Sequence, residues 1–158
     1  MGVFASLIDR SISGSLSSNA SSVDDYAFFD CTNLSEARFP AALTIGTNAF
    51  YNCTSLTSIY FPVVESIDDY AFRYGGFVNV SLPNVTSIGA HAFQDCSNLE
   101  TITVGTRWTT SVCALGKSAF KGCSMLSTIY VPSSLVDSYK SASSWSDYAG
   151  MIKAAPKE

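Results

Sequence analysis

The apolar positions of the chain recur with a period in the low twenties. Residues 45–62, IGTNAFYNCTSLTSIYFP, contain one unit: an Ala-Phe pair, a cysteine, an L-x-x-I-x-F run and a closing proline. Self-similarity at such a period is typical of a solenoid. The phenylalanine of the pair recurs at intervals of 22, 22, 21 and 27 residues, at Phe28, Phe50, Phe72, Phe93 and Phe120.

Each unit predicts one short strand. The last two apolar residues of the L-x-x-L-x-L run lie two apart, which is the spacing of a strand with one buried face. Proline ends four of the runs and Gly105 ends the other, and proline cannot continue a ladder in the middle of a sheet. The strands must therefore be short. The predicted core strips are Leu34/Ala37/Phe39, Leu56/Ile59/Phe61, Phe77/Val80/Leu82, Leu99/Ile102/Val104 and Leu126/Ile129/Val131.

The segment between strand and phenylalanine predicts a turn on the outer side. An apolar residue such as Ile45 or Ile67 precedes each phenylalanine by five positions and begins a tight turn or short helical turn. The next positions hold Asp24–Asp25 in one unit and Gly46 in the following one. Both types suit a turn or a helix N-cap, because Asp accepts hydrogen bonds from backbone N–H groups and Gly tolerates positive φ.

The two ends of the chain lie outside the repeat. We expect residues 1–22 to form an irregular N-terminal cap, residues 23–132 five repeat units, and residues 133–158 a C-terminal helical cap and tail. Ser134–Asp137 and Ser144–Asp147 each resemble a capping box that opens a short amphipathic helix. Such caps are needed because an uncovered terminal coil would leave apolar side chains in water.

Two units depart from the pattern. The third has Gly75–Gly76 close to the position where a cysteine is expected and is one residue short. The fourth carries about five extra residues after Gly105, including Arg107 and Trp108. A loop that holds an Arg-Trp pair is a candidate binding element.

The repeat AFxxCxxLxxIxxP resembles the BspA-type leucine-rich repeats. The matching stretches are AFFDCTNLSEARFP, AFYNCTSLTSIYFP, AFQDCSNLETITVG and AFKGCSMLSTIYVP. The resemblance implies an α/β solenoid with one curved parallel sheet of short strands, convex turns and a C-terminal helical cap. It also implies a binding role, because such repeats occur in bacterial surface and secreted adhesins, in protozoan surface proteins and in phage-encoded proteins. The family offers no catalytic residues to carry over.

Composition narrows the classes of function. Hydrophobic residues make up 47% and charged residues 14%, so the chain is not disordered by composition. The net charge of -4 is scattered, which argues against nucleic acid as a partner. No apolar run is long enough for membrane insertion. The first residues lack the pattern of a secretory signal peptide, yet the resemblance favours an extracellular, cell-surface or virion location.

Candidate chemistry is sparse. Cys31, Cys53, Cys96 and Cys123 share one repeat position, so we expect a buried column of free thiols whose side chains point the same way and cannot pair. Cys113 lies outside this column and is the one cysteine expected to react. His91 is expected to be solvated on the convex face. We therefore predict no catalytic constellation, metal site or cofactor, and a protein that is not an enzyme.

The concave face of the predicted sheet is the candidate binding surface. Strand alternation exposes one column formed by Arg38, Tyr60, Ser81, Thr103 and Tyr130, and a second formed by Glu36, Ser58, Asn79, Thr101 and Thr128. Tyr, Ser and Asn combine contact area with hydrogen bonding at a low ordering cost. The first hypothesis is a binding or adhesion module for a host or matrix protein or glycan. The alternative is a structural spacer or assembly unit of a surface appendage or virion, with a homo-oligomer as its signature.

Overall fold

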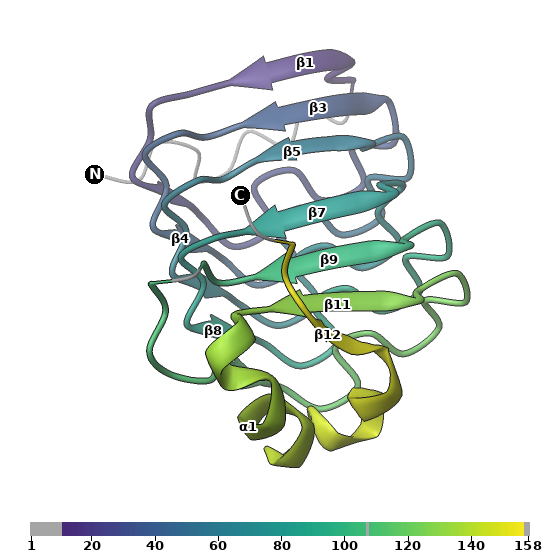
Figure 1. Ribbon diagram of the computed structural model, residues 1–158. Coiled ribbons are helices and arrows are strands. Elements are labelled where there is room, and N and C mark those ends of the chain that lie inside the picture. Colours follow the sequence, from purple (N-terminus) through teal and green to yellow (C-terminus); the bar gives the residue numbers. More distant parts are fainter. Residues whose placement is uncertain (1–10, 107, 157–158) are drawn as a thin grey trace.

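The computed structural model describes residues 11–106 and 108–156. The chain winds through successive coils, and each coil adds one strand to a row on one side of the molecule (Figure 1). All pairings within this row are parallel. The row contains β1 (Gly14–Ser17), β3 (Leu34–Arg38), β5 (Ser58–Tyr60), β7 (Asn79–Leu82), β9 (Thr101–Val104), β11 (Thr128–Val131) and β12 (Ile152–Ala154). The predicted solenoid of short parallel strands is confirmed.

The row of strands divides into two sheets. Hydrogen bonding gives the orders β1-β3-β5 and β12-β11-β9-β7, so the expected single sheet is interrupted between β5 and β7. The break falls at the shortened third unit, where the backbone N–H of Gly76 donates to the carbonyl oxygen of Leu56 at 3.1 Å. A Cβ on Gly75 would lie 2.3 Å from the Phe77 ring, so the glycine makes room for that ring.

A second ladder replaces part of the expected turn. Two-residue strands form a five-stranded parallel sheet: β2 (Ser22–Val23), β4 (Thr44–Ile45), β6 (Ser66–Ile67), β8 (Ser87–Ile88) and β10 (Ala114–Leu115). The sequence placed these residues at the start of a turn and missed the ladder. Two residues are too short for a detectable alternation, so the pairing emerges only when coils stack.

The turns that follow this ladder use Asp and Gly in an unforeseen way. Asp25 Oδ1 accepts a hydrogen bond from the backbone N–H of Thr47 in the next coil at 2.7 Å. Gly46 leaves space for this carboxylate, because a Cβ there would lie 2.5 Å from Asp25 Oδ1. Positive φ falls two positions later, at Asn48 (56°). Gly46 is thus required because the two coils approach closely there, and the left-handed conformation is adopted by Asn48 instead.

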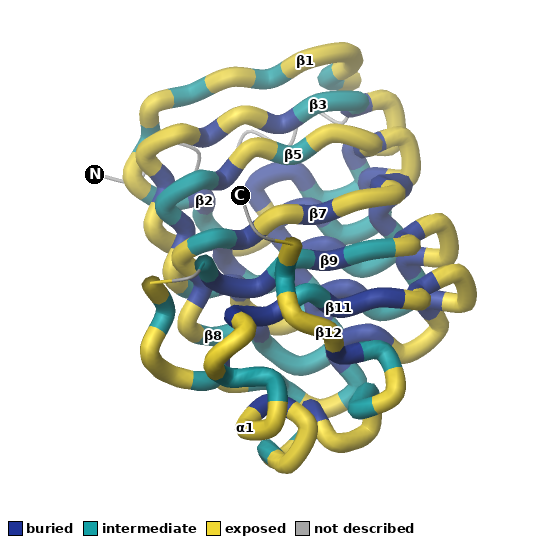
Figure 2. The backbone as a smooth tube through the Cα atoms, in the orientation of Figure 1, coloured by how far each residue is buried: buried dark blue, intermediate teal, exposed yellow. Residues whose placement is uncertain are grey.

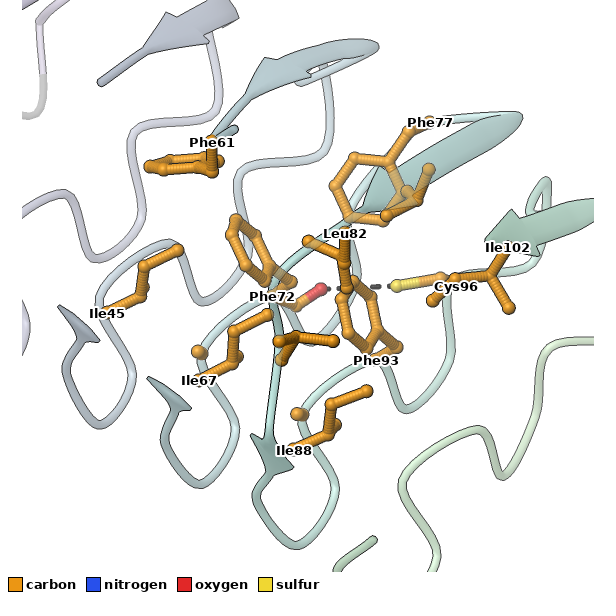
Figure 3. Close-up of a cluster of buried hydrophobic side chains, with 14 of the residues drawn as sticks. Ile45, Phe61, Ile67, Phe72, Phe77, Leu82, Ile88, Phe93, Cys96 and Ile102 are labelled. Atoms are coloured by element: carbon orange, nitrogen blue, oxygen red, sulfur yellow. Dashed lines mark hydrogen bonds between the residues drawn. The ribbon is translucent and has the colours of Figure 1, made fainter. Parts of the chain in front are cut away.

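The core is an ordered stack of aromatic rings between the two ladders. Phe28, Phe50, Phe72 and Phe93 lie with successive ring centroids 5.1, 5.2 and 5.3 Å apart, and all are buried. Phe61 fills the space beside Phe50 and Phe72 with its ring edge-on (Figure 3). Figure 2 shows buried positions on the inner side of each coil and exposed ones on the outer side. The recurring phenylalanines that mark the repeat therefore form one continuous buried column.

The cysteine column is also confirmed. Its four members are buried and form no disulfide. Three thiols point to the backbone of an earlier coil: those of Cys53, Cys96 and Cys123 donate to the carbonyl oxygens of Phe28, Phe72 and Phe93 at 3.1, 3.1 and 3.0 Å. Burial raises the pKa of Cys53 to about 12. The cysteines of the column therefore act as small core residues, and three of their thiols also donate hydrogen bonds to backbone carbonyl groups.

Both ends differ from the expectation. Residues 1–10 lie outside the described part of the chain, but β1 continues the parallel row in a stretch expected to be irregular, with Leu16 beside Ala37. The C-terminal cap contains the 3-10 helix η1 (Ser133–Leu135), α1 (Val136–Ser141) and the 3-10 helix η2 (Ser146–Met151). No side chain caps any of these helices, so the predicted capping boxes are wrong. Ile152, within the stretch expected to form the helical cap and tail, pairs with Ile129 as part of β12.

Candidate functional site

The register of the row assembles the two predicted columns. One column runs Ser17, Arg38 and Tyr60 in the first sheet, then Ser81, Thr103, Tyr130 and Lys153 in the second. The other runs Ser15, Glu36 and Ser58, then Asn79, Thr101 and Thr128. The structure thus brings the predicted concave residues together and adds Ser15, Ser17 and Lys153, which the sequence missed because their strands lie outside the repeat.

The first sheet presents a small charged and aromatic cluster. The guanidinium carbon of Arg38 lies 4.6 Å from the centroid of the Tyr60 ring, and Tyr60 keeps 43% of its surface exposed. Arg38 also pairs with Glu36 at 3.4 Å, while the Ser15 hydroxyl donates to Glu36 at 2.8 Å. An exposed Arg over an aromatic face is held by cation–π attraction of about 0.5–1 kcal/mol.

Apart from Lys153 on β12, the column residues of the second sheet are uncharged, and most of them carry hydroxyl groups. Thr101 donates its hydroxyl to the side-chain carbonyl of Asn79 in the adjacent strand. Thr128 is the exception to the predicted exposure, since it retains only 6% of its surface. Lys153 on β12 donates to the Thr128 hydroxyl at 3.1 Å and covers it. The expectation that Thr128 is available to a ligand is therefore wrong, because an added strand packs beside it.

The insertion after β9 forms a hydrogen-bonded turn at the edge of this surface. Gly105 has φ +81°, and the backbone N–H of Thr106 donates to Thr109 Oγ1 at 2.9 Å. The backbone N–H of Trp108 donates to Thr106 Oγ1 at 3.3 Å. The side chain of Trp108 is 77% exposed. Arg107, the other candidate of this loop, lies outside the described residues.

A pocket of about 480 Å³ joins the loop to the concave row. Its walls come from Ser81 on β7, from Thr103 on β9 with Thr106 and Trp108 of the following insertion, and from Pro156 after β12. The C-terminal segment runs back towards β7 and closes one side (Figure 1). This volume lies within the range of small-molecule pockets, about 300–1,000 Å³. Residues of both sequence candidates, the concave column and the loop, thus line one pocket.

The structure overturns the prediction that Cys113 is reactive. Cys113 is 3% exposed, and burial raises the pKa of its thiol to about 12. Its backbone N–H donates to the Tyr139 hydroxyl at 3.0 Å, and its carbonyl oxygen accepts from Trp145 Nε1 at 2.6 Å. The end of the insertion is therefore anchored beneath the C-terminal cap. The position of Cys113 outside the repeat predicts exposure, but tertiary packing buries the side chain.

His91 is also less solvated than predicted. Its ring stacks on Tyr70 with centroids 4.8 Å apart, and its Nδ1 is a buried atom with no hydrogen-bond partner. Within the described part of the chain, no group of three His, Cys, Asp or Glu side chains is arranged to hold a metal ion. Of the helices in residues 11–106 and 108–156, none has the length and apolar character to span a bilayer.

Sequence comparison agrees with this geometry. The profile described as "BspA type Leucine rich repeat region" matches six copies over residues 4–110 and 43–148. The chain belongs to the BspA-type leucine-rich repeat family. A comparison with curated protein sequences gives no match to this BspA-type chain.

Three solved structures extend the family assignment to the fold. A leucine-rich repeat protein of Bacteroides ovatus superposes with a TM-score of 0.72 and 23% identity, over 95% of this chain and 38% of that one. The T. pallidum leucine-rich repeat protein gives 0.64 and 25%, over 73% and 54%. A leucine-rich cell surface protein of Faecalibacterium prausnitzii gives 0.58 and 26%, over 77% and 41%. The BspA-type chain thus spans roughly two-fifths to half of the length of each.

Proposed function

We propose that this chain is a non-enzymatic binding module that recognises a protein or glycan at a cell surface or in a matrix through its concave row. The single observation that carries the proposal is the register of the row. It aligns exposed Arg38 with Tyr60 in the first sheet and hydroxyl-bearing Ser81 with Thr103 in the second. Extended concave faces of this kind are the surfaces that repeat proteins use for binding.

The composition of the row supports recognition of a large partner. Tyr and Arg are enriched among residues that dominate binding energy in protein interfaces. Ser, Thr and Asn side chains both donate and accept hydrogen bonds, which suits protein backbone and sugar hydroxyls alike. A cell-surface location is supported by the Faecalibacterium prausnitzii structure, which is described as a cell surface protein.

The test is a binding screen against glycans and extracellular surface proteins. Wild type is compared with a Tyr60→Ala/Tyr130→Ala variant, which removes both aromatic side chains of the column. Tyr26→Ala is the matched control, because Tyr26 is 48% exposed, close to the 43% of Tyr60, and lies in the turn after β2. We expect the double variant to lose binding and to keep its circular dichroism spectrum, and the control to bind normally. Equal binding by all three proteins would overturn the proposal.

The alternative is a spacer or assembly unit of a surface appendage or virion. Its mark would be a stable homo-oligomer together with no bound ligand. Light scattering of the same three proteins decides between the two functions. A binding module should have the mass of a single chain in the absence of ligand, whereas a spacer unit should have a defined multiple of that mass.

A further inference from the structure

The pocket beside β7 and β9 has one aromatic wall and several hydroxyl groups. Trp108 supplies the aromatic side chain, while Ser81, Thr103, Thr106 and Ser133 supply hydroxyls. The flat face of a Trp ring carries partial negative charge and attracts the polarised C–H groups of a ring placed over it. Hydroxyl side chains complete the recognition, because each can donate and accept.

The charge of the pocket restricts its ligand. Among the described residues that line it, none carries an acidic or basic side chain. A phosphate or carboxylate ligand would find no cationic partner among these described lining residues, at a substantial desolvation cost. A proline-rich peptide is also a poor fit, because grooves for such peptides are lined by several aromatic rings. A ring with C–H groups on its face and neutral hydroxyls on its rim fits both kinds of wall.

The pocket is supported by backbone constraints on two of its sides. The Trp108 turn is held by the two side-chain hydrogen bonds within Thr106–Thr109. Gly105, where the loop leaves the row, is tied to β7 by a hydrogen bond from its N–H to the Leu82 carbonyl at 3.0 Å. On the opposite side, the backbone N–H of Ala155 donates to the Val131 carbonyl at 2.8 Å. A preformed site loses less entropy when it binds.

We propose that this pocket binds a neutral sugar ring, with Trp108 as the stacking surface and the hydroxyls of Ser81 and Thr103 as hydrogen-bonding partners. The inference rests on the proposed function, since it assigns a ligand class to one part of the concave face. It commits to a neutral carbohydrate and excludes sialylated or phosphorylated ligands.

The two tryptophans permit a direct test. Trp108 is 77% exposed and Trp145 only 1%, so acrylamide quenches mainly the fluorescence of Trp108. The oligosaccharide for this test is chosen on a glycan array. The array carries neutral oligosaccharides that end in galactose, mannose, glucose or N-acetylglucosamine, printed beside sialylated ones. The best neutral oligosaccharide should then protect wild-type fluorescence from acrylamide. Trp108→Ala should weaken its binding by at least about tenfold, whereas Trp108→Phe, which keeps an aromatic face, should stay within about threefold.

Two further variants separate this inference from the proposed function. Thr103→Val removes a hydroxyl at nearly constant volume and should weaken sugar binding, while Tyr26→Ala, in the turn after β2, lies outside the pocket lining and should leave it unchanged. Preference for sialylated glycans, no bound oligosaccharide, or equal binding by wild type and Trp108→Ala would each overturn the inference. In all three cases loss of surface-protein binding in Tyr60→Ala/Tyr130→Ala would still support the wider proposal.

Discussion

Trp145 donates its indole N–H to the backbone carbonyl oxygen of Cys113 across 2.6 Å. The two residues are 32 positions apart, and the bond joins the C-terminal cap to the insertion of the fourth unit. The Tyr139 hydroxyl accepts from the N–H of the same Cys113, so both backbone groups of this residue are satisfied by the cap. One buried residue therefore couples the end of the array to the loop that carries Trp108.

Loss of this bond should weaken the cap. Trp145→Phe keeps an aromatic ring but leaves the Cys113 carbonyl without its donor, so we expect the free energy of unfolding to fall by about 1–3 kcal/mol. Urea unfolding followed by circular dichroism measures the change. Because the cap covers Cys113, the thiol should also react faster with iodoacetamide in the variant. Unchanged stability and unchanged labelling would show that the bond does not hold the cap.

The phenylalanine column should be sensitive to truncation. Phe50 is fully buried between Phe28 and Phe72, with centroids 5.1 and 5.2 Å away, so Phe50→Ala should cost about 3–5 kcal/mol. The exposed Ser58→Ala is the control and should stay within about 0.5 kcal/mol of wild type. Both values come from urea unfolding. A loss below about 1 kcal/mol for Phe50→Ala would contradict the stacked core.

Two glycines with similar φ provide a matched pair. Gly14 has φ +78° with open space around its would-be Cβ, whereas Gly105 has φ +81° and its Cβ would lie 2.9 Å from Thr109 Oγ1. The free energy of unfolding of Gly14→Ala should therefore fall by only about 1–2 kcal/mol, the cost of holding a residue with a Cβ at positive φ. Gly105→Ala should lose more, and its Trp108 should show altered acrylamide quenching because the turn must shift. Equal losses and identical quenching in both variants would refute this account of the loop.

The buried thiols predict a loss of stability in alkali. Folding raises the pKa of Cys53 and Cys113 from the ordinary value of 9.0 to about 12. The unfolded chain therefore releases these protons first, so the stabilisation is complete below pH 9 and declines towards pH 12. Between pH 9 and pH 12, each thiol lowers the free energy of unfolding by up to about 1.4 kcal/mol for every pH unit.

Replacing one thiol tests that slope. Urea unfolding of wild type and Cys113→Ala is measured from pH 8 to pH 10.5 under reducing conditions. The variant should be less stable at pH 8 and should lose stability less steeply above pH 9. Parallel curves for the two proteins would mean that the Cys113 thiol does not titrate differently in the folded and unfolded states.

Removal of the cap should expose the last coil. A chain ending at Pro132 lacks Tyr139, Trp145 and Ile152, all of them buried against the core. It also lacks β12, which leaves the edge of β11 unpaired and open to association. We expect aggregation, measured by size-exclusion chromatography with light scattering. A folded monomer would mean that the cap is not needed to end the array.

The sequence by itself determined the parts of the protein that repeat. Phe50, Cys53 and Leu56 recur at equivalent positions in other coils, so their spacing predicted strand, core column and family resemblance. Repetition makes this possible because each coil meets a nearly identical neighbour, and a local pattern then implies a contact between coils. The columns on the concave face followed from the same reasoning.

Only the tertiary structure decided the features that do not repeat. Cys113, Thr128 and Trp108 occupy environments set by segments far away in sequence: the cap, β12 and the C-terminal residues around Pro156. No periodic signal marks those contacts, so the sequence left Cys113 and Thr128 exposed and kept Trp108 apart from the concave column. Their burial and their grouping depend on how the chain ends fold back on the array, which is a matter of long-range packing.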